Sequence, residues 1–122
     1  MRFVNPLPFV KDIAASKAFY RDVMSLRVTR DHGDFVQFES GFALHDGGSL
    51  LQTIFGRDAQ EPETYGSQNL VLYFEVDDIE DAFNRIEPNV DLIHPIEEQN
   101  WGQMVFRFYD PDGHMVEAGE SQ

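Results

Sequence analysis

The stretch FEVDDIEDAFNRI, residues 74–86, repeats a pattern that the chain has already used in FVKDIAASKAFY, residues 9–20. In each copy an apolar run leads to an aspartate, which suits a helix N-cap, and then to an amphipathic segment. A second pair follows, because FVQFESGFALH in the first half is similar to VFRFYDPDGHMVE in the second. The sequence therefore predicts two copies of one unit, each with a strand, a helix and further strands. At one constant offset, the matching residues are Val10, Asp12 and Ile13 with Val76, Asp78 and Ile79.

Local signals in the first half agree with this order. VNPLPFV predicts an opening strand, whose two prolines suit a sheet edge or an irregular ladder. Asp12 should cap a helix with an apolar stripe made of Ala15, Phe19 and Val23. DFVQFE and GFALHD predict two strands joined near Ser40. After SLLQTIF, the polar stretch GRDAQEPETYGSQ predicts a linker between the halves.

The second half gives stronger signals. NLVLYFEV predicts a central strand, and Asp77 or Asp78 should cap a helix that ends before Pro88. VDLIHPI and QMVFRFY predict strands, and DPDG predicts a type I turn into HMVEAGE. At 122 residues the chain has the length of one domain. We expect an α+β fold of two βαβββ modules, at about 1–56 and 69–122 with a linker at about 57–68, forming curved mixed sheets around a concave cavity.

Composition excludes several classes of function. The net charge of −13, with nine basic against 22 acidic residues, argues against binding to nucleic acid or to an anionic membrane surface. The chain has no cysteine, so disulfides and thiolate metal sites are excluded. No apolar run is long enough to span a bilayer, and the N-terminus lacks the pattern of a signal peptide. We therefore expect a cytoplasmic protein.

Alternation along the strands predicts a polar sheet face. Val116 and Ala118 should face a helix, which places Glu117 on the opposite side of the last strand. If the sheet is curved, this polar face lines a pocket for a ligand; the alternative is an ordinary solvated sheet face. The residues expected on it are Asn5, Gln37, His45, Tyr73, Arg107 and Glu117.

The paired halves, and the closing segment FYDPDGHMVE above all, resemble the vicinal oxygen chelate superfamily. This superfamily contains glyoxalase I, extradiol dioxygenases, fosfomycin resistance enzymes and bleomycin resistance proteins. The resemblance implies up to four metal-ligand positions in the opening and closing strands, which match Asn5, His45, Val71 and Glu117. His45 and Glu117 could bind a divalent metal ion, whereas Asn5 is a weak ligand and Val71 cannot coordinate. Catalytic zinc normally has three protein ligands, so a metal-free site is favoured and no cofactor is firmly predicted.

Three further side chains are candidates for ligand binding. Arg107 could clamp a carboxylate or phosphate, or form an ion pair with Glu75 or Glu117. Trp101 could stack on a flat ligand, or pack as an ordinary indole. Tyr73 could donate to a ligand, or bond to a neighbour across the sheet. His32, His94 and His114 flank turns or proline and are expected at the surface.

Two functions follow from the resemblance. The first is a small-molecule-binding protein of the bleomycin-resistance kind, with a ligand in a polar cavity. The alternative is a metal-dependent lyase of the glyoxalase kind, in which Glu117 moves a proton and His45 helps to hold the metal. A dioxygenase is the least favoured reaction, because its iron site needs two histidines and a carboxylate. Exposed sheet edges also predict a homodimer.

Overall fold

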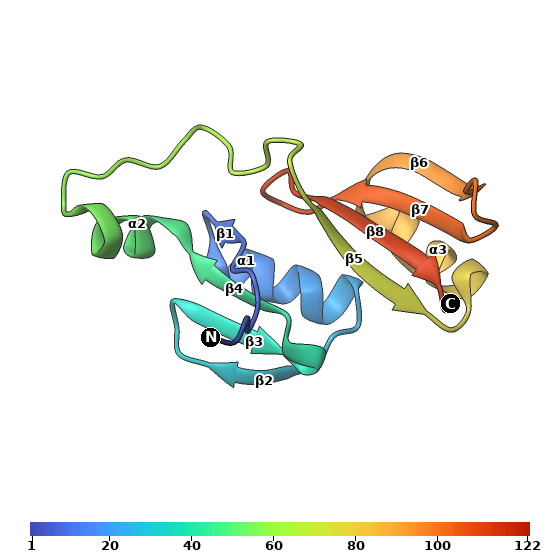
Figure 1. Ribbon diagram of the computed structural model, residues 1–122, viewed down its shortest axis with the longest axis horizontal. Helices are drawn as coiled ribbons and strands as arrows, with labels where there is room; N and C mark the ends of the chain where they lie inside the picture. Colours follow the sequence, from blue (N-terminus) through green and yellow to red (C-terminus); the bar gives the residue numbers. More distant parts are fainter. The chain divides into compact units, whose positions relative to one another are not determined.

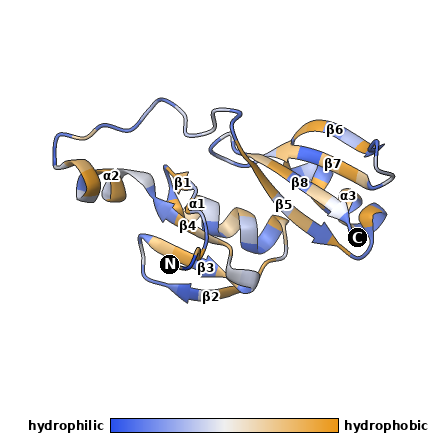
Figure 2. Cartoon of the chain, viewed as in Figure 1, coloured by the Kyte–Doolittle hydropathy of each residue, from blue (hydrophilic) through white to orange (hydrophobic).

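The computed structural model describes residues 1–122, which form two compact units, Met1–Tyr65 and Gly66–Gln122. The boundary between the units lies inside the polar stretch that was expected to be the linker, which is mostly hydrophilic in Figure 2. Each unit has its own four-stranded sheet (Figure 1). The assignment of both modules to one domain stays a prediction.

The first unit is a βαβββ module followed by a helix. Its strands have the order β1-β4-β3-β2, in which β1 and β4 are parallel and the other pairs are antiparallel. Its elements are β1 (Phe9–Val10), α1 (Ile13–Ala18), the π-helical η1 (Phe19–Val23), β2 (Val28–Asp31), β3 (Phe35–Phe38), the 3-10 turn η2 (Glu39–Gly41), β4 (Ala43–Asp46) and α2 (Gly47–Phe55).

The second unit repeats this topology. Its strands have the order β5-β8-β7-β6, again with one parallel pair, β5 and β8. The predicted α+β fold with two βαβββ modules and mixed sheets is therefore confirmed. The elements are β5 (Val71–Val76), α3 (Ile79–Ile86), the 3-10 turn η3 (Glu87–Asn89), β6 (Asp91–Glu98), β7 (Met104–Tyr109) and β8 (Met115–Glu120).

The internal repeat has a structural cause at the strand-to-helix junctions. Strands β1 and β5 end at Val10 and Val76, and the aspartate two residues later caps the following helix. Asp12 Oδ1 accepts from the Ala15 N–H, and Asp78 Oδ1 from the Asp81 N–H, each at 3.0 Å. These bonds satisfy N–H groups that the first turn of a helix leaves without a partner.

The helix-facing side of the second sheet forms the core of its unit. Phe106 and Phe108 on β7 are fully buried, as are Val116 and Ala118 on the neighbouring β8. Phe83 of α3 meets Phe106 edge to face, with ring centroids 5.2 Å apart. The predicted inward-facing side of β8 is thus confirmed, and Phe106 and Phe108 of β7 lie on the same side of the sheet.

The predicted apolar stripe of the first helix was wrong. Ala15 is exposed, whereas Ser16 and Tyr20 are buried. After Ala18 the chain winds into the π-helical turn η1, whose wider spacing changes which side chains face the sheet. The Tyr20 ring packs against the rings of Phe38 and Phe42, at centroid distances of 5.9 and 4.8 Å.

Other elements of the first unit also differ from expectation. The opening strand is only Phe9–Val10, and residues 1–8 have no regular structure. The stretch SLLQTIF, for which the sequence predicts no element, lies in helix α2, where Asp46 Oδ2 accepts from the Ser49 N–H at 2.9 Å. The apolar residues of α2 are coloured orange in Figure 2, and Ile54 and Phe55 are exposed. None of the helices combines the length and apolar character that crossing a membrane requires.

Candidate functional site

A row of polar side chains crosses three strands of the second sheet. In the pairing register, Glu117 of β8 lies between Tyr73 of β5 and Arg107 of β7. Residues that are directly paired on adjacent strands point to the same face, so these three side chains share the face opposite α3. The register therefore brings together three of the residues that the sequence predicted for the site.

Arg107 is the centre of a hydrogen-bond network on this face. Its Nε donates to Glu117 Oε1 at 2.7 Å, and its Nη2 donates to Gln99 Oε1 at 3.0 Å. Its Nη1 lies 2.9 Å from His94 Nε2. A guanidinium can only donate, so this ring nitrogen accepts. The network uses three of the five guanidinium N–H groups and fixes the direction of the side chain.

Glu117 is paired with Arg107 but keeps one oxygen open. Its side chain is 13% exposed and that of Arg107 is 26% exposed. Glu117 Oε2 makes no hydrogen bond within the chain, so it can accept from a ligand. The question that the sequence left open is thus answered in part: the ion pair forms with Glu117, while Glu75 bonds elsewhere.

Sequence reasoning missed two members of the network, His94 and Gln99. His94 was expected at the surface, yet its ring is half-buried beside Arg107. Strand β6 has register irregularities on both sides of His94, and such bulges redirect side chains. The signal that could have revealed His94 is Pro95, since proline in a strand often marks an edge or a bulge. His114, also expected at the surface, is buried beside the DPDG turn, whereas His32 is exposed as predicted.

Tyr73 and Trp101 are both tied to one buried amide. Gln103 Nε2 donates to the Tyr73 hydroxyl, and Trp101 Nε1 donates to Gln103 Oε1, each at 2.8 Å. The Tyr73 hydroxyl in turn donates to Glu75 Oε2 at 2.7 Å. Burial of the phenol, followed by this bond to Glu75, raises the pKa of Tyr73 above its ordinary value. Tyr73 is therefore a neutral donor, and Glu75 is its acceptor.

The first unit carries different side chains at the positions equivalent to Arg107 and Glu117. Gln37 of β3 pairs with Ala43 of β4, just as Arg107 pairs with Glu117. The residue that corresponds to Glu117 is therefore Ala43, and the predicted match of His45 with Glu117 was wrong by two positions. His45 corresponds instead to Gly119, because Phe35 pairs with His45 as Val105 pairs with Gly119.

His45 and Asn5 make contacts of their own in the first unit. The His45 Nδ1 lies 2.9 Å from the Asp46 carbonyl oxygen, and the ring packs 6.2 Å from that of Phe35. Asn5 Nδ2 donates to the Gly41 carbonyl oxygen at 2.8 Å. Asn5 therefore uses its amide N–H to hold the N-terminal segment against the turn before β4.

The four positions implied by the family resemblance do not fit a metal site. With the register corrected, they are Asn5, Ala43, Val71 and Glu117, of which Ala43 and Val71 have no donor atom. Glu117 has one oxygen committed to Arg107. No group of three His, Cys, Asp or Glu side chains that could hold a metal ion occurs in the chain. A catalytic metal with three protein ligands is not supported by this donor set.

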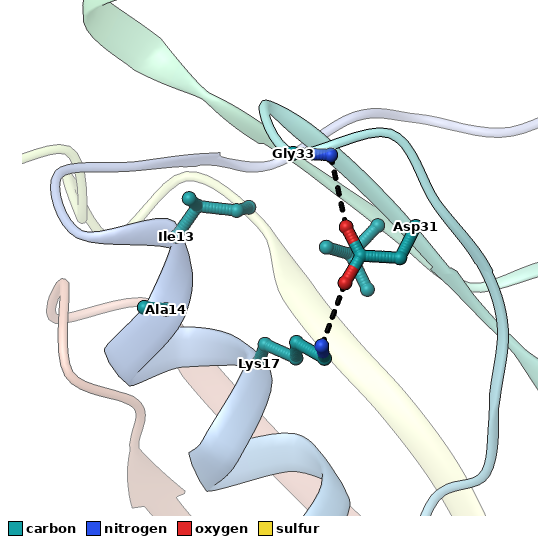
Figure 3. A pocket seen from close by; sticks show the side chains of 6 residues that line it. Ile13, Ala14, Lys17, Asp31 and Gly33 are labelled. Atoms are coloured by element: carbon teal, nitrogen blue, oxygen red, sulfur yellow. Dashed lines mark hydrogen bonds and ion pairs between the residues drawn. The ribbon is translucent and has the colours of Figure 1, made fainter.

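A separate hollow of about 160 Å³ lies in the first unit, beside helix α1 and strands β2 and β3 (Figure 3). Lys17 Nζ and the Gly33 N–H both donate to Asp31, at 2.6 and 2.9 Å. The polar groups of the hollow therefore satisfy one another, and none of the predicted site residues lines it. Its lining residues are Ile13, Ala14, Lys17, Asp31, Gly33 and Val36.

Comparison with known proteins identifies the class. The Glyoxalase-like domain family matches residues 3–122, so the chain belongs to that family. A crystal structure of a protein of unknown function from Agrobacterium tumefaciens str. C58 is 57% identical, with a TM-score of 0.95, covering 100% of this chain and 95% of that one.

The chain is also similar to two more distant proteins. A lactoylglutathione lyase from Agrobacterium tumefaciens is 25% identical, with a TM-score of 0.70, covering 98% of this chain and 93% of that one. Uncharacterized protein YraH of Bacillus subtilis (strain 168) is 24% identical over 128 aligned residues, with 96% of each chain covered. The predicted superfamily is confirmed.

Proposed function

We propose that this protein binds a small organic molecule on the open face of the second sheet, without a catalytic metal. The observation that carries the proposal is the 2.7 Å bond between Arg107 and Glu117. It gives the face a fixed guanidinium and a carboxylate with one open oxygen. Such a pair can accept from one group of a ligand and donate to another.

The corrected register supports binding without a metal. The residue at the position equivalent to Glu117 is Ala43 and not His45. The implied metal site therefore has one good ligand instead of two. A divalent ion held by one carboxylate depends on water for its remaining ligands and binds weakly. The proposed role therefore depends on hydrogen bonds and ring contacts.

A metal-dependent lyase of the glyoxalase kind is the second candidate. The observation that favours it is the 25% identity to a lactoylglutathione lyase over nearly the whole chain. In that reaction Glu117 would move a proton, which its open oxygen permits. The loss of donor atoms at Ala43 and Val71 argues against it. A shared fold alone does not carry a shared reaction.

A thermal-shift screen of metal-stripped protein against a metabolite and drug library tests the proposal. We expect at least one compound to raise the melting temperature in the presence of EDTA. Glu117→Gln should then lower the affinity for that compound about tenfold or more, measured by calorimetry, because the substitution removes the charge of the acceptor. Glu80→Gln, on the exposed surface of α3, is the matched control and should bind normally. Hemithioacetal turnover that disappears with EDTA would select the lyase instead.

We also propose that the protein is a cytoplasmic homodimer. Strands β2 and β6 lie at sheet edges, and unpaired edge groups favour pairing with another chain. Light scattering should give twice the chain mass of 14.0 kDa at micromolar concentration. A stable species at 14.0 kDa would contradict the dimer.

A further inference from the structure

His94 lies at the edge of the second sheet, next to the ion pair of its open face. Strand β6 is the last strand in the order β5-β8-β7-β6, so its outer side has no neighbouring strand in that sheet (Figure 1). The pairing register shifts on both sides of His94, and its side chain is 21% exposed beside Arg107. Protons from solvent therefore reach this ring.

The partners of His94 fix which of its ring nitrogens carries hydrogen. Nδ1 lies 2.7 Å from the Pro95 carbonyl oxygen, which can only accept, so Nδ1 is the donor. Nε2 lies 2.9 Å from Arg107 Nη1, which can only donate, so Nε2 is the acceptor. Both contacts require the same species, the neutral imidazole with its hydrogen on Nδ1.

Arg107 is held by acceptors of three different kinds. Glu117 Oε1 accepts from its Nε, Gln99 Oε1 from its Nη2, and the His94 ring from its Nη1. Gln99 Nε2 also donates to the Glu97 carbonyl oxygen at 3.2 Å, so this amide has a fixed orientation. Histidine is the side chain that ordinarily changes its charge between about pH 5 and 8. His94 is therefore the acceptor that a change of pH near neutrality affects.

A proton on His94 replaces an attraction by a repulsion. It turns Nε2 into a donor, which then faces a donor of a permanently charged guanidinium. Glu97 gives the imidazolium another partner, because its Oε2 lies 3.1 Å from His94 Nδ1. The ring therefore has two arrangements, a neutral one bonded to Arg107 and a charged one paired with Glu97.

Charged groups on the neighbouring elements agree with this division. The titratable residues on the open face around His94 are Asp91 and Glu97 of β6, Arg107 and Tyr109 of β7, and Glu117 of β8. Those of α3, which packs against the other face, are Glu80, Asp81 and Arg85, and all three are exposed. On the open face only Arg107 repels an imidazolium, and at 2.9 Å it is in direct contact with the ring. Protonation therefore separates His94 from Arg107.

We propose that His94 is a positioning residue that controls Arg107 through its own protonation state. Neutral His94 holds the guanidinium beside Glu117, whereas protonated His94 pairs with Glu97 and releases Nη1 of Arg107. This inference rests on the proposed binding function and names its regulation. A ligand meets a fixed guanidinium at neutral pH and a partly released one in acid, and binding to an ordered partner costs less conformational entropy. Loss of this one charged hydrogen bond is expected to weaken binding about tenfold.

Side-chain NMR of isotope-labelled protein without ligand tests the positioning of Arg107 directly. Spectra are recorded from about pH 7.5 to about pH 5.5, across the range in which histidine ordinarily takes up a proton. At the higher pH we expect the His94 ring with hydrogen on Nδ1. As the pH falls, the Nη1 signal of Arg107 should move with the titration of His94, while the Nε signal, held by Glu117, stays in place. Hydrogen on Nε2 at the higher pH, or an Nη1 signal that does not follow His94, would overturn the inference.

Two substitutions of His94 separate its role as acceptor from its proton. His94→Gln keeps an acceptor and takes up no proton, so the Arg107 signals should match those of the neutral wild type at both pH values. His94→Phe keeps a ring without an acceptor, so Nη1 should give the released signal at both. His32→Gln, at an exposed position of the first unit, is the matched control and should keep the wild-type response. A neutral wild-type signal in His94→Phe would contradict the positioning role, and the wild-type titration decides the matter if a variant does not fold.

The metabolite and drug library tests the regulation itself. Metal-stripped wild type and His94→Gln are screened at both pH values, and affinities are measured by calorimetry. Compounds that stabilise both proteins at the higher pH should bind the wild type about tenfold more weakly at the lower pH, and His94→Gln equally at both. Equal wild-type affinity at both pH values would overturn the regulation and leave the proposed function standing. A library without any binding compound would reject the proposed function, whereas the NMR titration would still decide whether His94 positions Arg107.

Discussion

The two units have the same topology but carry different residues on their open faces. Strand pairing joins Gln37 to Ala43 in the first unit and joins Arg107 to Glu117 at the equivalent positions of the second. On the helix-facing sides the two units agree, since Phe38 and Phe108 are both fully buried. A sheet side that packs on a helix must stay apolar, whereas an open side can change without loss of the fold. Of these two equivalent pairs, only the one in the second unit is an ion pair.

The largest loss of stability is expected on the helix-facing sides of the sheets, where the two units agree. Phe38→Ala and Phe108→Ala should each lower the free energy of unfolding by about 3–5 kcal/mol, because both rings are fully buried. Urea denaturation followed by circular dichroism measures both values. A difference of more than about 2 kcal/mol between them would show that the two positions are not equivalent.

A smaller loss of stability is expected on the open faces of the sheets, where the two units carry different residues. Arg107→Met should lower the free energy of unfolding by about 2–3 kcal/mol, because it leaves the carboxylate of Glu117 without its partner. Gln37→Met should lower the free energy of unfolding by less than about 1 kcal/mol, since the Gln37 side chain makes no hydrogen bond in the chain. Urea denaturation of both variants gives the comparison.

A double variant sharpens this result. Arg107→Met combined with Glu117→Leu should recover most of the lost stability, because an apolar pair leaves no unpaired charge. Destabilisation by the double variant equal to the sum of the two single changes would contradict the account. Urea denaturation measures this coupling.

The smallest effect concerns one of the exposed ion pairs of the first unit, that between Lys17 and Asp31. The Lys17 ammonium, with the Gly33 N–H, lowers the pKa of Asp31 below its ordinary value. A lowered carboxyl pKa stabilises the fold above the unfolded pKa of about 3.9 and loses this effect as pH falls through the folded value. Lys17→Met should therefore flatten the pH dependence of the melting temperature below about pH 4. Asp31→Asn is the control, and an unchanged profile in both variants would contradict the pairing.

The sequence predicted faces well and register poorly, for one physical reason. Side chains alternate with a period of two, so Ala43 and His45 lie on the same face and a shift of two positions leaves the pattern unchanged. The paired residues Gln37 and Ala43 are six positions apart in the chain, whereas the paired residues Arg107 and Glu117 are ten positions apart. Pattern matching could not see that difference in length.

The amide network was beyond sequence reasoning for a different reason. Tyr73, Trp101 and Gln103 are brought together by strand pairing and a tight turn. Nothing in the local pattern marks Gln103 as buried, since glutamine is usually exposed. The N-caps at Asp12 and Asp78, in contrast, depend only on residues three positions away and could be predicted.

The open face of the second sheet is proposed to bind its ligand without a metal. The most direct test screens the whole compound library by thermal shift, on metal-stripped protein and again after addition of zinc, nickel or manganese. We predict the same shift in every case, because Glu117 is held by Arg107 and no third ligand is available. A shift that appears only with metal would contradict the account and favour the lyase.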